Sequence, residues 1–183
     1  MGGQRLDDVL PAAQLGEAWA ISAVYAELAP RVQGYLRGRG AAEPEDLSSE
    51  VFLAVLPRLA NVTGGAAGLR TFVFSVAHAR LVDDLRRRGR REPATAYDEA
   101  QDRRTSASAE EGALDLVATD GVRTVLAGLP DDQCEVLLLR IVADLTVEQV
   151  AAAIGRSPGA VKQLQRRALL SLRAQVADGR VPL

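Results

Sequence analysis

Arginine supplies nearly all of the positive charge in this chain, and it is concentrated in two blocks. Residues 80–91 hold six Arg and two Asp, a net charge of +4, and residues 156–173 hold five basic groups and no acid. Residues 92–120 lie between these blocks and hold eight acids and two Arg, a net charge of −6. Basic blocks of this kind attract phosphates, so they can direct a protein to DNA although the whole chain has a net charge of −2.

The residue types that perform catalysis or bind metal ions are scarce. His78 is the only histidine and Cys134 the only cysteine, which excludes a disulfide framework and a zinc cluster of Cys and His built within this chain. The carboxylates Asp83 and Asp84 are adjacent, so on a helix they point about 100° apart, which is poor geometry for an acid/base pair. No Gly-rich phosphate loop of the Walker or dinucleotide kind occurs. We therefore expect a protein that is not an enzyme, with no catalytic residue, no metal, no cofactor and no small-molecule substrate.

Helices must position the two basic blocks, because apolar residues recur at intervals of three and four and no alternating strand pattern appears. The first helical pattern covers residues 15–39, and Pro30 is expected to kink or divide it. A second helix is expected over residues 45–59, with acids in its first turn. Residues 1–15 lack a sustained period and are predicted to be a mobile leader. The second helix has an apolar face made of Leu47, Val51, Phe52, Val55 and Leu59.

The first basic block forms the end of a third helix. Residues 61–68 (NVTGGAAG) predict a flexible connection, after which a helix starting near Leu69 has apolar groups nearly all round until Ala79. We therefore expect the first half of this helix in the core and its second half to emerge as a basic end.

Residues 92–117 are polar, rich in Ala, Ser and Glu, and without a clear period until their end. A stretch of this length is too long for a loop within one compact domain, so it predicts a linker between two domains. No run of about 18 apolar residues occurs, and no charged segment precedes a long apolar run at the N-terminus. We therefore expect a cytoplasmic protein without direct membrane insertion.

The second basic block belongs to a predicted helix-turn-helix. Thr146 and Gln149 match a capping box, and Ser157 followed by Pro158 places a hydroxyl at the N-cap and a proline at the first helical position. Cys134 is expected to be a small core residue on a helix. Beyond the linker, helical patterns cover about residues 116–128, 131–142, 146–154 and 158–176.

The last helix is amphipathic, as a recognition helix in the major groove must be. Amide and guanidinium groups suit the edges of adenine and guanine respectively, so its polar side can contact bases. The residues expected to face inward are Val161, Leu164, Ala168, Leu169 and Leu172. Those expected to face outward are Lys162, Gln163, Arg166 and Arg167.

The two modules, in this order, resemble an extracytoplasmic function (group 4) sigma factor of bacterial RNA polymerase, within the sigma-70 family. The resemblance covers about residues 20–178 and implies an all-α fold. It implies a sigma 2-like helical bundle over residues 16–91, an acidic linker over 92–115, and a sigma 4-like helix-turn-helix domain over 116–178. It rests on PEDLSSEVFLAVLPRL (44–59), LRTFVFSVAHARLVDDLRRRGRR (69–91), LPDDQCEVLLLRIVADLTVEQVAAAIGRSPGAVK (129–162) and RRALLSLR (166–173).

The resemblance also implies which residues bind the polymerase and the promoter. Docking on the clamp helices of the largest polymerase subunit is expected of Asp46, Leu47, Glu50 and Phe52. Recognition of the −10 element, with an unpaired base held near the start of the third helix, is expected of Asn61, Phe72, His78, Arg80, Asp83, Arg86, Arg87, Arg88, Arg90 and Arg91. Recognition of the −35 element is expected of Arg156, Ser157, Lys162, Gln163, Arg166 and Arg167.

The partners that this resemblance implies are core RNA polymerase, through its clamp helices and flap, promoter DNA, and an anti-sigma protein. Two alternatives remain. A sigma-like decoy would titrate an anti-sigma factor and would show erosion of the basic residues. A stand-alone helix-turn-helix regulator would bind duplex DNA tightly without polymerase.

Overall fold

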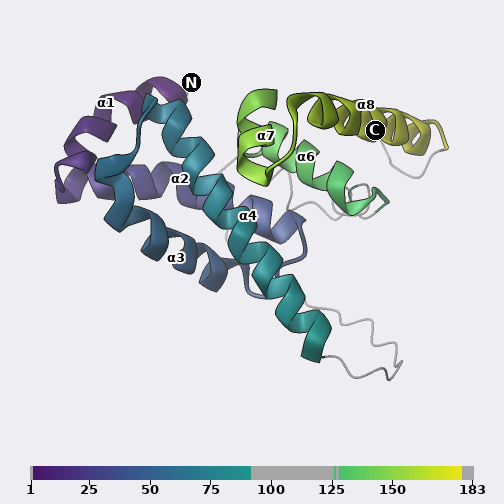
Figure 1. Cartoon of the computed structure of the whole chain (residues 1–183), viewed down its shortest axis with the longest axis horizontal. Helices are drawn as coiled ribbons and strands as arrows, with labels where there is room; N and C mark the ends of the chain where they lie inside the picture. Colours follow the sequence, from purple (N-terminus) through teal and green to yellow (C-terminus); the bar gives the residue numbers. More distant parts are fainter. Residues whose placement is uncertain (1, 92–125, 127, 179–183) are drawn as a thin grey trace.

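The computed structural model describes residues 2–91, 126 and 128–178, and most of these residues lie in helices (Figure 1). No strand occurs within these ranges, which confirms the predicted all-α fold. The linker predicted over 92–115 and nearly all of the helix predicted over 116–128 lie outside the described residues. The helices are α1 (Gly2–Gln14), α2 (Ala18–Gly38), α3 (Pro44–Val55), η1 (Leu56–Asn61), α4 (Gly65–Arg91), α6 (Asp131–Ile141), α7 (Val147–Ile154) and α8 (Pro158–Ala177).

The first helix departs most from the sequence prediction. A mobile leader is predicted for residues 1–15, whereas α1 occupies most of this segment and packs against α2 and α4. Leu6, Leu10 and Ala13 of α1 are buried in the core. Their spacing is helical, but Pro11 lies inside the helix, and a proline in so short a pattern argues against one. The prediction of a mobile leader was therefore wrong.

Helix α4 forms the centre of the first domain and also its basic end. It is 27 residues long, or about 40 Å at 1.5 Å per residue, and begins at Gly65, earlier than the predicted start near Leu69. Its second half leaves the core as predicted, and Figure 1 shows its last turns extending beyond the neighbouring helices. Helix α2 lies within the predicted range 15–39, and Pro30 lies inside it without dividing it. The buried residues of α4 are Ala66, Leu69, Val73, Phe74, Ala77 and Leu81.

Gly68 allows the start of α4 to approach the preceding connection closely. A Cβ at this position would lie 1.7 Å from the carbonyl oxygen of Thr63. Gly68→Ala is therefore expected to lower the free energy of unfolding by about 1 to 3 kcal/mol, the usual cost of overpacking. Thermal melting followed by circular dichroism measures this loss.

Gly89→Ala is the matched control, because it lies in the same helix and a Cβ there would meet no atom within 4 Å. That variant should gain about 0.5 to 1 kcal/mol from the better helix propensity of alanine. A Gly68→Ala protein that melts at or above the wild-type temperature would contradict the close contact.

The described part of the second domain contains the helices α6, α7 and α8, whose boundaries agree with the sequence. The Thr146 hydroxyl accepts a hydrogen bond from the Gln149 amide, and the Gln149 side chain accepts one from the Thr146 amide, which confirms the predicted capping box. Ser157 caps α8 by accepting from the amide of Ala160. Gly155 ends α7 at a φ of 66°, a left-handed conformation that favours glycine. The turn between α7 and α8 is therefore fixed at both sides.

The two domains pack against each other along α2 and α4 (Figure 1). The Gln149 side chain in α7 donates a hydrogen bond to the carbonyl oxygen of Ala67 in α4 at 3.1 Å. Next to this contact, Arg70 of α4 pairs with Asp144 at 3.2 Å. Among the helices described, none has the length and apolar composition needed to cross a membrane.

Candidate nucleic-acid interface

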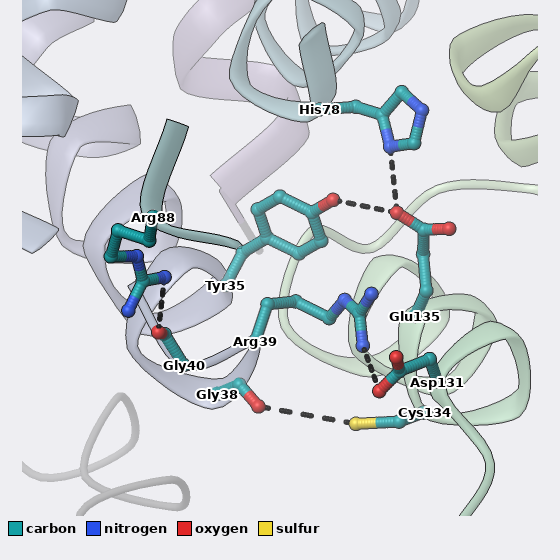
Figure 2. A network of polar contacts seen from close by, with 9 residues as sticks. All are labelled: Tyr35, Gly38, Arg39, Gly40, His78, Arg88, Asp131, Cys134 and Glu135. Carbon is teal, nitrogen blue, oxygen red and sulfur yellow. Dashed lines mark hydrogen bonds and ion pairs between the residues drawn. The ribbon is translucent and has the colours of Figure 1, made fainter. Parts of the chain in front are cut away.

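The basic end of α4 presents most of its arginines to solvent. Arg80, Arg86, Arg87 and Arg90 are exposed, and so is Asp83. Arg88 differs from them because it pairs with Asp84 at 3.1 Å and donates to the carbonyl oxygen of Gly40 at 2.8 Å (Figure 2). The chain therefore holds Arg88 against the end of α2, while the exposed arginines can reach phosphates. Arg91 is the last residue of α4.

An open hollow lies beside the first turns of α4. It has a volume of about 550 Å³ and contains the predicted residues Asn61 and Phe72. Backbone and hydroxyl groups of its wall can donate and accept hydrogen bonds, and the half-buried Phe72 ring offers an apolar surface. We call it the α4 hollow. It is lined by Arg58, Asn61, Val62, Thr63, Gly68, Thr71 and Phe72.

Sequence reasoning missed Arg58, Thr63 and Thr71 in this hollow. Arg58 precedes the connection by several residues, and Thr71 lies nearly two turns into α4. Only the backbone path through η1 and Gly64, which has a φ of 81°, brings these side chains to one place. In the sequence, Arg58 is only an isolated basic residue near the end of the helix predicted over 45–59.

His78 is half-buried and does not belong to the exposed basic end of α4 but contacts the second domain. Its Nδ1 lies 2.7 Å from Oε1 of Glu135, and the Tyr35 hydroxyl donates to the same carboxylate oxygen at 3.0 Å (Figure 2). Nearby, Arg39 pairs with Asp131 at 3.4 Å, and the Cys134 thiol points to the Gly38 carbonyl at 3.9 Å. The structure therefore places the predicted −10 residue His78 in a polar contact between the domains.

Glu135 is a buried carboxylate, 7% exposed, on an otherwise apolar face of α6. Burial by itself raises the pKa of this carboxyl, but the hydrogen bond and charge of His78, the charge of Arg39 and the hydrogen bond from Tyr35 outweigh burial. The pKa of Glu135 is therefore lowered, and the group is held as a carboxylate. Burial, reinforced by the Glu135 charge, raises the pKa of Tyr35, so its hydroxyl remains a donor.

Helix α8 presents the predicted polar face. Lys162, Gln163, Arg166 and Arg167 are all exposed, at spacings of three and four that place them on one side of the helix. The predicted inward residues Val161, Leu164 and Ala168 are buried, whereas Leu169 is 44% exposed and was wrongly placed inside.

Two predicted −35 residues also have structural partners within the domain. Ser157 is occupied as the N-cap of α8, and Arg156 lies 3.8 Å from Asp132. The exposed α8 side chains are the groups best placed to contact base edges.

The predicted docking residues on α3 divide between surface and core. Asp46 and Glu50 are exposed, but Leu47 is 6% exposed and Phe52 is 2% exposed. Phe52 packs edge-to-face on Tyr25, with ring centroids 4.7 Å apart. The apolar periodicity of the helix thus predicted the burial of Leu47 and Phe52 correctly, whereas the resemblance placed both at a docking surface. Leu53, 75% exposed, is the large apolar side chain that α3 offers to a partner.

Comparisons with known proteins match both domains. Residues 24–91 match the family described as Sigma-70 region 2, and residues 125–174 match Sigma-70, region 4. The ECF RNA polymerase sigma factor SigD of Mycobacterium tuberculosis is 31% identical, over 96% of this chain and 86% of the relative. The ECF RNA polymerase sigma factor ShbA of Streptomyces griseus is 36% identical, over 87% of this chain and 88% of the relative. A structure of the sigma factor RpoE in complex with the anti-sigma factor NepR from Bartonella quintana has a TM-score of 0.66 at 18% identity, over 85% of this chain and 96% of that chain.

Proposed function

This chain belongs to the extracytoplasmic function (ECF) sigma factors of the sigma-70 family, and from that premise we propose how its two domains share promoter recognition. The observation that carries the proposal is a pair of exposed basic faces, one on the end of α4 and one on α8, that lie on separate domains. Each face alone supplies a weak electrostatic contact with DNA. When both faces belong to one polymerase-bound molecule, the binding of one face raises the effective concentration of the other at the DNA, so the two together bind more tightly than either alone.

The first domain binds the −10 element in this proposal. The α4 hollow accepts an unpaired base, which Phe72 can stack against and the hydroxyl and backbone groups can hydrogen-bond. The exposed arginines at the end of α4, together with Arg91, meet the phosphates on either side. Arg88 stabilises this surface through its ion pair with Asp84 and its hydrogen bond to the Gly40 carbonyl oxygen.

The same domain binds core polymerase through the exposed side of α3. Asp46, Glu50 and Leu53 lie at intervals of four and three, so they share one face of this helix. An acidic face with one large apolar side chain suits a basic helical partner. The family resemblance implies that this partner is the pair of clamp helices of the largest polymerase subunit. The flap is the expected partner of the second domain, and both interactions place the protein in the cytoplasm.

The packed arrangement of the domains cannot contact both promoter elements at once. Their names place the elements about 25 base pairs apart, which is about 85 Å at 3.4 Å per base pair. Gln149 contacts Ala67 of α4, and α8 begins only nine residues later, a reach of at most about 32 Å for extended chain. We therefore propose that the domains separate when core polymerase binds. An anti-sigma protein, such as the one bound to RpoE in the structure from Bartonella quintana, is expected to favour an inactive arrangement.

Run-off transcription with core polymerase tests this function. Purified protein, bacterial core enzyme and a pool of promoter fragments should yield transcripts only when both proteins are present, and the templates should share −10 and −35 sequences. Core binding without any transcript would favour a decoy. Tight binding to duplex DNA in the absence of core would favour a stand-alone regulator.

Substitutions on α8 test its role at the −35 element. Gln163→Ala and Arg166→Ala should each reduce discrimination between the cognate and a scrambled −35 sequence by about 1 to 3 kcal/mol, because each removes a contact to a base edge. Holoenzyme binding to the two promoters measures this difference. Arg173→Ala, exposed further along the same helix, is the control and should leave it unchanged. An equal loss on both promoters would show a phosphate contact instead.

A further inference from the structure

Helix α1 contacts the wall of the α4 hollow, although it lies before residues 24–91, which match the family description. It packs against α2, α4 and η1, and Figure 1 shows it beside the start of α4. The connection 62–64, between η1 and α4, supplies two of the residues that line the hollow. The shape of this connection therefore decides the shape of the hollow.

Gln14, the last residue of α1, holds the beginning of this connection. Its Nε2 donates one hydrogen bond to the Val62 carbonyl oxygen at 2.7 Å and another to the Leu59 carbonyl oxygen at 3.2 Å. The Leu59 carbonyl lies in the last turn of η1 and also accepts a hydrogen bond from the Val62 amide, whereas the Val62 carbonyl follows the end of η1. One side-chain amide thus contacts the backbone on both sides of this end and fixes the direction in which the chain leaves η1.

Asp7 holds the other end of the connection. Its Oδ1 accepts a hydrogen bond from the Ala66 amide at 2.6 Å, which satisfies a free N–H in the first turn of α4. Gly65 directly precedes Ala66 and has a φ of 61°. A Cβ at Gly65 would lie 2.7 Å from Asp7 Oδ1. A carboxylate from α1 therefore substitutes for the local N-cap side chain that a glycine cannot provide.

Two neighbouring glycines make these anchors necessary. Gly64 and Gly65 both have positive φ, and glycine passes between backbone regions at little steric cost. Without the contacts from α1, the connection would sample several conformations. The free-energy cost of ordering the connection would then weaken the binding of a base in the hollow.

We propose that α1 positions the α4 hollow for its base, with Asp7 and Gln14 as the positioning residues. The proposal rests on the base-binding role given to the hollow under the proposed function. It assigns to α1 a part in promoter recognition, in addition to its packing in the core. Neither side chain needs to touch the DNA, because both act through the backbone at residues 59–66.

Binding of holoenzyme to single-stranded −10 oligonucleotides tests the proposal. The probe is the −10 strand of a promoter found by run-off transcription, intact or with one abasic site, and the measured quantity is the ratio of the two affinities. Asp7→Ala and Gln14→Met should each lower this ratio at the hollow position by about fivefold, the size expected from one lost cap. Asp7→Asn keeps an accepting oxygen and should restore the wild-type ratio.

Leu10→Ala is the matched control for stability. Leu10 is 4% exposed on the same helix, so this variant should melt at a lower temperature than Asp7→Ala or Gln14→Met. It leaves both anchors in place, and its affinity ratio should stay at the wild-type value. A ratio that instead follows melting temperature across all variants would overturn the positioning role.

The outcomes for the hollow and for α1 are distinguishable. If wild-type holoenzyme shows a ratio near one at every position, the base-binding role of the hollow fails, and the role of α1 fails with it. If wild type distinguishes intact from abasic oligonucleotides, and Asp7→Ala and Gln14→Met distinguish them equally well, only the inference about α1 fails.

Discussion

Phe52→Ala should lower the free energy of unfolding by about 3 to 5 kcal/mol, the usual cost of removing a buried phenylalanine side chain. Phe52 is 2% exposed and packs edge-to-face on Tyr25, so truncation leaves a cavity between α2 and α3. Chemical denaturation measures the loss. Binding to core polymerase, measured below the melting temperature of the variant, should change little, because the side chain does not reach the surface.

Leu53→Ala is the matched control in the same helix. Leu53 is 75% exposed, so its truncation should change the free energy of unfolding by no more than about 0.5 kcal/mol. The same variant should weaken binding to core polymerase if α3 docks by its exposed face. The reverse pattern, in which Phe52→Ala keeps its stability and loses core binding, would show that α3 rearranges to present Phe52.

Glu135→Ala should destabilise the packing of the two domains by about 3 kcal/mol, because it removes two hydrogen bonds to a charged group worth at least roughly 1.5 kcal/mol each. The lost partners are the Tyr35 hydroxyl and His78 Nδ1 (Figure 2). Tyr35 would then keep a buried hydroxyl without its acceptor. Small-angle X-ray scattering should show a larger radius of gyration, and urea denaturation should show lower stability.

Two further variants make this prediction specific. Glu135→Gln keeps an oxygen that can accept from Tyr35, so it should lose less stability than Glu135→Ala. Glu148→Ala removes an exposed acid from the first turn of α7 and should change stability by no more than about 0.5 kcal/mol. An unchanged radius of gyration in Glu135→Ala would mean that the apolar contacts of α4 and α7 hold the domains together without the carboxylate.

The same carboxylate makes the packing dependent on pH. Its pKa is lowered in the folded protein, so Glu135 contributes stability that is fully present above its ordinary value of about 4.3. This contribution is lost as the pH falls through the lowered pKa of the folded state. The difference in stability between wild type and Glu135→Gln should therefore shrink as the pH falls through that acidic range.

Local interactions explain which features could be predicted from the sequence. The caps at Thr146 and Ser157 involve residues three positions apart, so the sequence contains both partners of each hydrogen bond. The exposed face of α8 and the basic end of α4 follow from helical period and composition in the same way. The burial of Phe52 also followed from periodicity, although the family resemblance placed this residue at a docking surface.

The remaining features depend on residues that are far apart in the chain. Gln14 lies 48 residues from Val62, Asp7 lies 59 residues from Ala66, and Tyr35 lies 100 residues from Glu135. The sequence does not show which groups Gln14, Asp7 and Glu135 will contact, because these side chains form such contacts only after the helices have packed. The sequence by itself therefore determined the described helices that follow α1, the caps at Thr146 and Ser157, and the two basic faces. Only the tertiary structure decided that α1 braces the hollow and that His78 meets Glu135 between the domains.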